Sequence, residues 1–251
     1  MSVSERFFCI HEQWSVVHLP EKPNGFAILL IGDTDHYVNE KTSLWMQHPE
    51  RLKFIDTLRN EGYTIFTSNF YGRHWGSKKA CELAANLYYY ILKREILNPH
   101  IHIIAEGMGA LLALKLFEKM KNNIRSTIMI NPCLHLYRYY KNERNNRLFY
   151  KRLLTELSAA HQIEKEVVEE KVLKKNNAWK FHNNIPLYIF HETSFRKYRF
   201  EEHSKRYEKY RLQENSPINL KLYLPGKSIS YFSKPIFSFL RQYEQKLSSP
   251  L

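Results

Sequence analysis

The stretch IIAEGMGALLAL, residues 103–114, decides the fold that the sequence predicts. The mostly apolar residues 102–104 predict a short buried strand, and a tight turn follows at residues 105–109. The next residues predict a helix with small side chains in its first turn. Gly107 stands at the apex of the turn, where glycine adopts a positive φ without steric cost. A strand, a tight turn and a helix in this order are typical of open parallel α/β sheets.

The rest of the chain repeats this alternation of strands and helices. Apolar runs predict further strands over residues 25–32, 63–70, 125–132, 185–192 and 218–226. Helical spacing of apolar residues predicts helices over residues 49–63, 78–95 and 234–247. A charged, mostly helical stretch is expected from residue 137 to about residue 180. Such alternation predicts a mainly parallel sheet with helices on both faces.

Length and composition indicate one soluble domain. A chain of 251 residues with 43% hydrophobic residues is long enough to bury a large core. Its three cysteines form no Cys-x-x-Cys pair, which favours a reducing compartment. The start of the chain has no apolar stretch typical of a secretory signal, and the longest apolar run, residues 26–31, is too short to cross a bilayer. We therefore expect a cytoplasmic protein without a transmembrane segment.

The formal net charge of +13 allows nucleic acid, an anionic membrane or an acidic protein as a partner. Lys and Arg are spread along the chain and mixed with Glu. No zinc-finger spacing, RNP-type strand or basic-zipper heptad is present in the sequence, which disfavours nucleic acid. A generally basic surface is the favoured interpretation, and a basic scaffold for nucleic acid or anionic membrane stays an alternative.

Six stretches, in their order and spacing, resemble the α/β-hydrolase family over nearly the whole chain. They are FAILLIGDTDHY, EGYTIFTSNFYGRHWGS, IHIIAEGMGALLALKL, RSTIMINP, NNIPLYIFHETS and NLKLYLPGKSISYF. The third resembles the turn that carries the nucleophile as Gly-x-Ser-x-Gly. The resemblance implies one α/β-hydrolase domain over residues 1–251, with a helical cap inserted at about residues 135–180.

The resemblance also implies three catalytic positions, and all three are substituted. A serine hydrolase needs a nucleophile, a base and an acid that orients the base. Gly107 stands at the nucleophile position, Phe195 at the acid position and Ile229 at the base position. The last histidine of the chain is His203, so the final strand, loop and helix contain no imidazole. The sequence therefore predicts a hydrolase fold without the Ser-His-Asp chemistry.

A remnant of the oxyanion hole is expected around the turn. Its donors would be the backbone amides of Met108, after the apex, and of Asp33, after Gly32. The Asp33 carboxylate beside this notch argues against a carboxylate or phosphate ligand there. Glu106 is an acid or base candidate on the turn, although an exposed turn residue is the favoured interpretation.

Relocated catalytic groups stay open as an alternative that would make the protein an esterase- or thioesterase-like enzyme. Cys133 follows a strand at its carboxyl end, and His135 lies two residues further on as a possible base. His191 ends another strand near the expected pocket. His100 and His102 resemble a metal pair, but no third ligand has a suitable spacing, so neither a metal nor another cofactor is expected.

The expected cap alternates aromatic residues with Arg and Lys. Its basic surface would comprise Arg138, Arg144, Arg147 and Arg152. One interpretation is a binding surface for an acidic protein or an anionic ligand; the other, which we favour, is solvated amphipathic helices whose tyrosines pack on the domain. The leading functional hypothesis is a non-catalytic hydrolase-like protein that binds a small hydrophobic or anionic ligand or an acidic protein partner.

Overall fold

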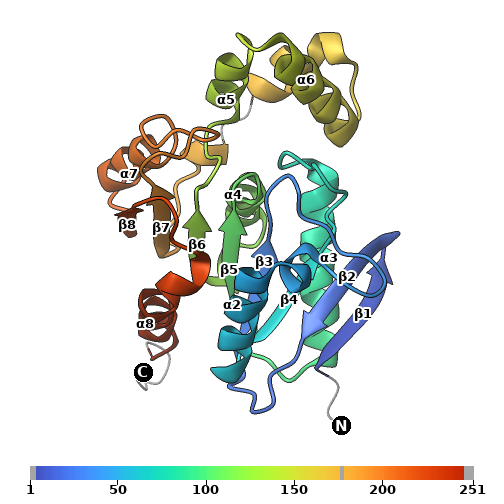
Figure 1. The fold of residues 1–251 in the computed structure, drawn as a ribbon, viewed down its shortest axis with the longest axis vertical. Helices are drawn as coiled ribbons and strands as arrows, with labels where there is room; N and C mark the ends of the chain where they lie inside the picture. The colour runs from blue at the N-terminus through green and yellow to red at the C-terminus, as the bar shows by residue number, and fades with distance from the viewer. Residues whose placement is uncertain (1–3, 176–177, 246–251) are drawn as a thin grey trace.

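The structure is a computed structural model that describes residues 4–175 and 178–245, and its centre is one eight-stranded sheet with the order β1-β2-β4-β3-β5-β6-β7-β8 (Figure 1). The strands are β1 (Glu5–Ile10), β2 (Gln13–His18), β3 (Ala27–Ile31), β4 (Thr64–Ser68), β5 (Ile101–Glu106), β6 (Ile124–Ile130), β7 (Leu187–Glu192) and β8 (Ile218–Tyr223). The strands from β3 to β8 run parallel, whereas β2 runs antiparallel to both β1 and β4. The predicted mainly parallel sheet is thus confirmed.

Helices cover both faces of the sheet, as predicted (Figure 1). The helices of the body are α1 (Leu44–Gln47), α2 (Pro49–Asn60), α3 (Lys78–Arg94), α4 (Gly109–Lys119), α7 (Ser204–Gln213) and α8 (Ser233–Glu244). Side chains of β3 alternate between the two faces, so that Leu29 packs with α3 and α4 while Leu30 packs with α2 and α8. Residues 246–247 of the last predicted helix lie outside the described residues.

Two further helices, α5 (Leu136–Glu143) and α6 (Arg147–His161), lie over the carboxyl ends of the strands (Figure 1). We call them, with the short turns that follow, the cap; of the range 135–180 expected for it, residues 176–177 are outside the described part of the chain. An apolar cluster fastens the cap to the body, because Leu153 and Leu157 of α6 pack with Trp75 and Met108 below them. Tyr139 and Tyr140 of α5 are buried in the same cluster.

The order of the strands fixes where a site can form. The chain places β4 on one side of β3 and then β5 on the other, so β3 and β5 are the two neighbours at which the strand order reverses. In open α/β sheets the crevice beyond the carboxyl ends of such strands is the usual position of a ligand. Residues 32–33 and 107–108 follow these two strands directly.

No helix within the described ranges is long and apolar enough to cross a membrane.

Candidate functional site

Gly107 occupies the apex of the turn between β5 and α4 with a φ of +52°. A Cβ atom on this glycine would lie 2.2 Å from Cγ of Asp33 and 2.3 Å from its Oδ1. No side chain fits in that space without a shift of the carboxylate. The position where the resemblance implies a nucleophile is therefore already filled, by the side chain of a residue that follows a different strand.

Both oxygens of the Asp33 carboxylate have close partners. Oδ1 accepts hydrogen bonds from the Met108 backbone amide at 2.7 Å and from the Tyr198 hydroxyl at 3.1 Å. Oδ2 pairs with the Lys197 ammonium at 2.7 Å, and Lys197 also donates to the Thr34 hydroxyl at 2.7 Å. The expected remnant of an oxyanion hole thus holds an anion of the chain itself. The Met108 amide is not left free for an outside ligand.

Two glycines allow the strands and the turn to approach this closely. A Cβ on Gly32 would lie 2.5 Å from Cβ of His36, and a Cβ on Gly109 would lie 2.6 Å from the Ile31 carbonyl oxygen.

His36 is buried, and its Nε2 lies 3.0 Å from the Ser68 carbonyl oxygen. Burial lowers the pKa of His36 to about 4, so this imidazole is neutral at neutral pH.

Glu106 ends β5 and forms a two-pronged ion pair with Arg51 of α2, with one contact at 2.8 Å. Its side chain is only 21% exposed, so the expectation of an exposed turn residue is wrong. Burial raises the pKa of Glu106, and the charge of Arg51 opposes that rise. The sequence alone did not indicate this ion pair, because Arg51 lies 55 residues away from Glu106, on helix α2.

The other two positions to which the resemblance assigns catalytic roles pack in different parts of the molecule. Phe195 lies against the apolar cluster of the cap, with its ring centroid 6.1 Å from that of Tyr198. Ile229 begins a 3₁₀ turn, Ile229–Phe232, and packs with the cluster that α2 and α8 form on one face of the sheet. Neither side chain carries a group that could act as an acid or a base.

The alternative reactive groups are not brought together. Cys133 is fully buried, and burial raises the pKa of its thiol well above the ordinary value, which opposes formation of a thiolate. The His135 ring stacks on Trp179 with a centroid distance of 5.0 Å, and no hydrogen bond between it and Cys133 is found in the described part of the chain. Burial lowers the pKa of His135 to about 4.

His191 and His203 are buried hydrogen-bonding residues near the cap. Nδ1 of His191 lies 2.7 Å from the Ser204 hydroxyl oxygen. Nδ1 of His203 accepts hydrogen bonds from the backbone amides of Leu134 at 3.0 Å and of His135 at 3.2 Å. Burial lowers the pKa of His191 to about 4 and that of His203 to about 3. The contacts of His203 hold the loop after β6 in place. The contact with Ser204 gives His191 a hydrogen-bonding partner within the protein.

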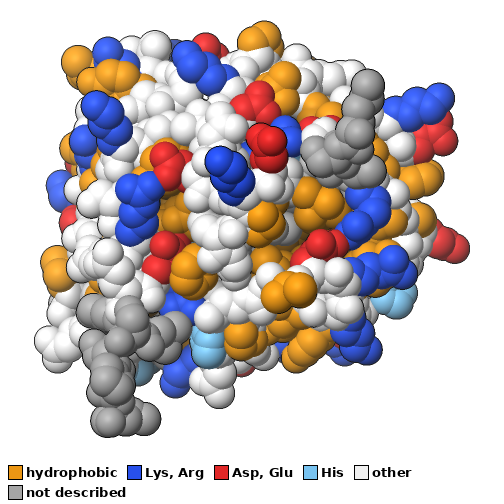
Figure 2. All heavy atoms as spheres, turned by 90° about the horizontal axis from the view of Figure 1, so that it is seen from below, with side chains coloured by type: hydrophobic (Ala, Val, Ile, Leu, Met, Phe, Trp, Pro, Cys, Tyr) orange, Lys and Arg blue, Asp and Glu red, His pale blue; other side chains and the backbone are white. Residues whose placement is uncertain are grey.

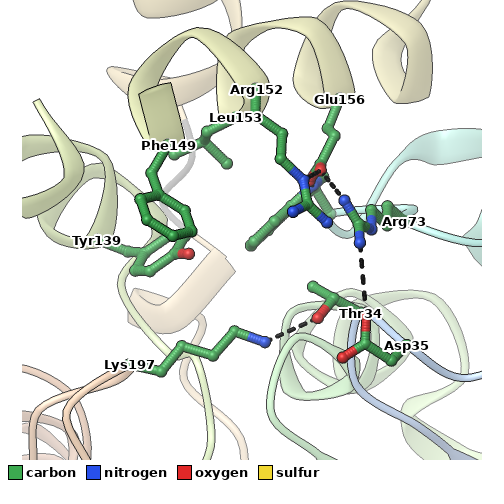
Figure 3. A pocket seen from close by; sticks show the side chains of 10 residues that line it. Thr34, Asp35, Arg73, Tyr139, Phe149, Arg152, Leu153, Glu156 and Lys197 are labelled. Carbon is green, nitrogen blue, oxygen red and sulfur yellow. Dashed lines mark hydrogen bonds and ion pairs between the residues drawn. The ribbon is translucent and has the colours of Figure 1, made fainter. Parts of the chain in front are cut away.

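A cavity of about 250 Å³ lies between α6 and the body (Figure 3). Lys197 belongs both to its wall and to the ion pair with Asp33, whereas Gly107 and Met108 are buried. The side chains that line it are Thr34, Asp35, Arg73, Trp75, Tyr139, Phe149, Arg152, Leu153, Glu156 and Lys197. The cavity therefore has an aromatic wall and several charged groups.

Glu156 of α6 is the centre of the polar contacts in that cavity (Figure 3). It pairs with Arg73, accepts a hydrogen bond from Nε of Arg152 at 2.8 Å and accepts another from the Trp75 indole nitrogen at 3.0 Å. Arg73 also lies 3.4 Å from a carboxylate oxygen of Asp35. The sequence did not indicate the contacts of Glu156 with Arg73 and Trp75, since they join a helix of the cap to a loop of the body.

The basic residues expected on the cap differ in their surroundings. Arg138, Arg144 and Arg147 are exposed, whereas Arg152 is tied to Glu156 at the rim of the cavity. On the face opposite the cap, Lys and Arg are interspersed with Asp, Glu and hydrophobic side chains (Figure 2). Within residues 4–175 and 178–245, no group of three or more His, Cys, Asp or Glu side chains is placed to hold a metal ion.

Comparison with known proteins finds solved structures that have a similar fold. No family model and no curated protein sequence matches the chain. Among solved structures, the acylaminoacyl peptidase of Pyrococcus horikoshii is similar with a TM-score of 0.69 at 13% identity, over 97% of this chain and 41% of that chain. Est1E from Butyrivibrio proteoclasticus is similar with a TM-score of 0.59 at 12% identity, over 97% and 98% of the two chains.

A sugar hydrolase from Lactococcus lactis is similar with a TM-score of 0.66 at 12% identity, over 97% of this chain and 100% of that one. The chain spans about two fifths of the length of the peptidases that it matches. At such low identities the similarity shows the fold alone. Together with the strand order, it shows that the chain has the α/β-hydrolase fold.

Proposed function

We propose that this protein is a non-catalytic member of the α/β-hydrolase fold that binds a small ligand in the cavity under its cap. The observation that carries the proposal is the Asp33 carboxylate, which fills the space at Gly107 and accepts the Met108 amide. A serine hydrolase uses such an amide to stabilise the oxyanion of its intermediate. Here the Asp33 carboxylate, which is paired with Lys197, occupies the space that a nucleophile would need. It also accepts the hydrogen bond of the Met108 amide that an oxyanion would accept.

The cavity beside this ion pair supports a binding role. Its volume of about 250 Å³ suits a ligand smaller than a typical drug. Trp75, Tyr139 and Phe149 offer apolar contact, and the cations Arg73, Arg152 and Lys197 are matched by the carboxylates of Asp35, Glu156 and Asp33. A small ligand with an apolar body and no net charge fits this combination best.

Labelling with a serine-directed fluorophosphonate tests the absence of catalysis. We expect no labelled serine in the purified protein, because no serine stands on the turn and Asp33 blocks the site. An active serine hydrolase in the same reaction provides the positive control. Stoichiometric labelling of any serine, identified by peptide mass spectrometry, would contradict the proposal.

Native mass spectrometry tests the binding role. We expect a small-molecule mass to accompany the purified wild type and to be lost in Leu153→Trp, which fills the cavity from α6. The matched control is Leu212→Trp, the same substitution at an exposed leucine of α7. Equal retention of that mass in both variants would place the ligand elsewhere.

A further inference from the structure

The first turn of α6 exposes two large apolar side chains next to each other. Leu148 is 79% exposed and Phe149 is 54% exposed. Single exposed apolar residues are ordinary on protein surfaces, but two adjacent ones at the start of a helix form a small apolar protrusion. Phe149 also lines the cavity, while Leu148 is not part of the cavity lining.

Three cations that form no ion pair within the described residues lie next to these side chains in the chain. The sequence from residue 144 to residue 155 contains no Asp or Glu. Arg144, Arg147 and Lys151 are all exposed, and no carboxylate pairs with any of the three within the described residues. Arg152 is set apart from them by its bond to Glu156. We call Arg144, Arg147, Leu148, Phe149 and Lys151 the α6 tip.

The placement of these charges is unfavourable for the isolated helix. The amino end of a helix carries a partial positive charge, so acidic residues stabilise it and basic residues do not. The N-cap residue Asn146 makes no side-chain capping hydrogen bond, and the first turn contains no acidic residue. Arg147 is instead the first residue of α6. An external anion at the α6 tip would relieve this conflict by pairing with the arginines and the first backbone amides.

We propose that the α6 tip docks the protein on an anionic lipid surface. Cations beside protruding Leu and Phe side chains are the combination by which interfacial helices hold anionic headgroups and insert shallowly into the acyl boundary. The cap forms one end of the molecule along its longest axis (Figure 1). An end of the molecule can meet a flat bilayer while the body stays on the far side of the cap. Docking would bring the cavity wall at Phe149 to the lipid surface.

Vesicle flotation tests this docking surface. The full chain is mixed with vesicles of phosphatidylcholine alone or of phosphatidylcholine with about 30% phosphatidylserine. We expect binding to the anionic vesicles only, and a loss at raised salt because the charge contacts are screened. Arg144→Glu/Arg147→Glu should weaken the affinity at least about tenfold, and Leu148→Glu should weaken it several-fold.

Matched controls separate the tip from the basic surface as a whole. Lys22→Glu/Lys53→Glu makes the same change in net charge on exposed body residues, and Leu212→Glu repeats the apolar change on α7. Both controls should retain more than half of the wild-type affinity. The proposal is overturned if no anionic vesicle binds, if the controls lose as much as the tip variants, or if soluble polyglutamate competes as well as the lipid. The last outcome would identify an acidic protein as the partner.

Discussion

The two ends of the central sheet differ in the features that each shares with a serine hydrolase. At the carboxyl end the strand–turn–helix frame of a hydrolase is present, but Gly107 has no reactive group and Asp33 fills the space. At the amino end Ser126, His102 and Glu244 form a hydrogen-bonded row of the residue types that hydrolases use. The carboxyl end has the strand–turn–helix geometry without a reactive side chain, and the amino end has the reactive side-chain types without that geometry.

The row at the amino end differs from a catalytic triad in orientation and in access. Nδ1 of His102 lies 2.7 Å from the Ser126 hydroxyl, and Nε2 lies 3.2 Å from Glu244. A hydrolase histidine faces its serine with Nε2 and its acid with Nδ1, which is the reverse. Ser126 and His102 are also fully buried. Residue types therefore do not define a site unless a substrate can reach them.

Removing Glu244 should have a large effect on stability, comparable with that of any substitution considered at these two ends. Glu244→Ala would leave the buried His102 imidazole and the Tyr63 hydroxyl, which donates to Glu244 at 2.6 Å, without an acceptor. Each such loss costs about 1–3 kcal/mol, so we expect the free energy of unfolding to fall by about 3 kcal/mol in urea titrations.

Two controls make the amino-end measurement specific. Glu244→Gln keeps an oxygen acceptor and should cost much less than Glu244→Ala. Glu61→Ala removes a carboxylate that pairs with exposed Arg241 on the same helix α8 and should cost less than about 1 kcal/mol. If Glu244→Ala and Glu61→Ala proved equal, the row would not stabilise the amino end.

At the carboxyl end the sharpest measurement is the coupling between Gly107 and Asp33. Gly107→Ala places a Cβ 2.2 Å from the carboxylate carbon and at a positive φ, which together should cost about 2–4 kcal/mol of unfolding free energy. In an Asp33→Ala background only the backbone cost of about 1 kcal/mol remains. The double-mutant cycle should thus give a coupling of about 2 kcal/mol.

Additivity of the two substitutions would contradict the contact between Asp33 and the turn. The same contact means that Gly107→Ser alone cannot restore a nucleophile. Asp33 would first have to be replaced, and positions 195 and 229 would still lack an acid and a base.

The sequence predicted the strands from β3 to β7 because their residues are mostly apolar, as buried parallel strands require. It also predicted β8, which is a partly exposed strand at the other edge of the sheet. It did not predict the hairpin of β1 and β2. The strand β1 is half-buried at the edge of the sheet, and the two residues between β1 and β2, His11 and Glu12, adopt positive φ without a glycine to signal the turn. Local propensity is weakest in such an edge hairpin.

The candidate site divides in the same way. Gly107 and Asp33 could be selected from the sequence because each follows a predicted strand directly. The partner of Asp33 could not be selected from the sequence, because Lys197 is 164 residues away and is one of the 38 Lys and Arg residues of the chain. A buried carboxylate requires a cation or several donors, but only the fold determines which ones it meets.

The smallest expected effect separates the two ends by pH. Burial, together with the nearby His135, His191 and Arg138, lowers the pKa of His203 at the carboxyl end to about 3. In the unfolded chain histidine has a pKa near 6.5, so the unfolded chain binds a proton that the folded chain excludes between about pH 6.5 and 3. Stability from this residue is therefore lost as the pH falls below about 6.5.

His203→Gln keeps an acceptor for the Leu134 and His135 amides and removes this titration. Between pH 7.5 and 5.5 the unfolding free energy of the wild type should fall by about 1 kcal/mol more than that of the variant, measured in urea. At the amino end, His102→Gln should give a smaller difference, because Glu244 partly offsets the effect of burial on the pKa of His102. A larger difference at His102 would mean that the carboxylate does not support the imidazole there, and the contrast between the two ends would fail.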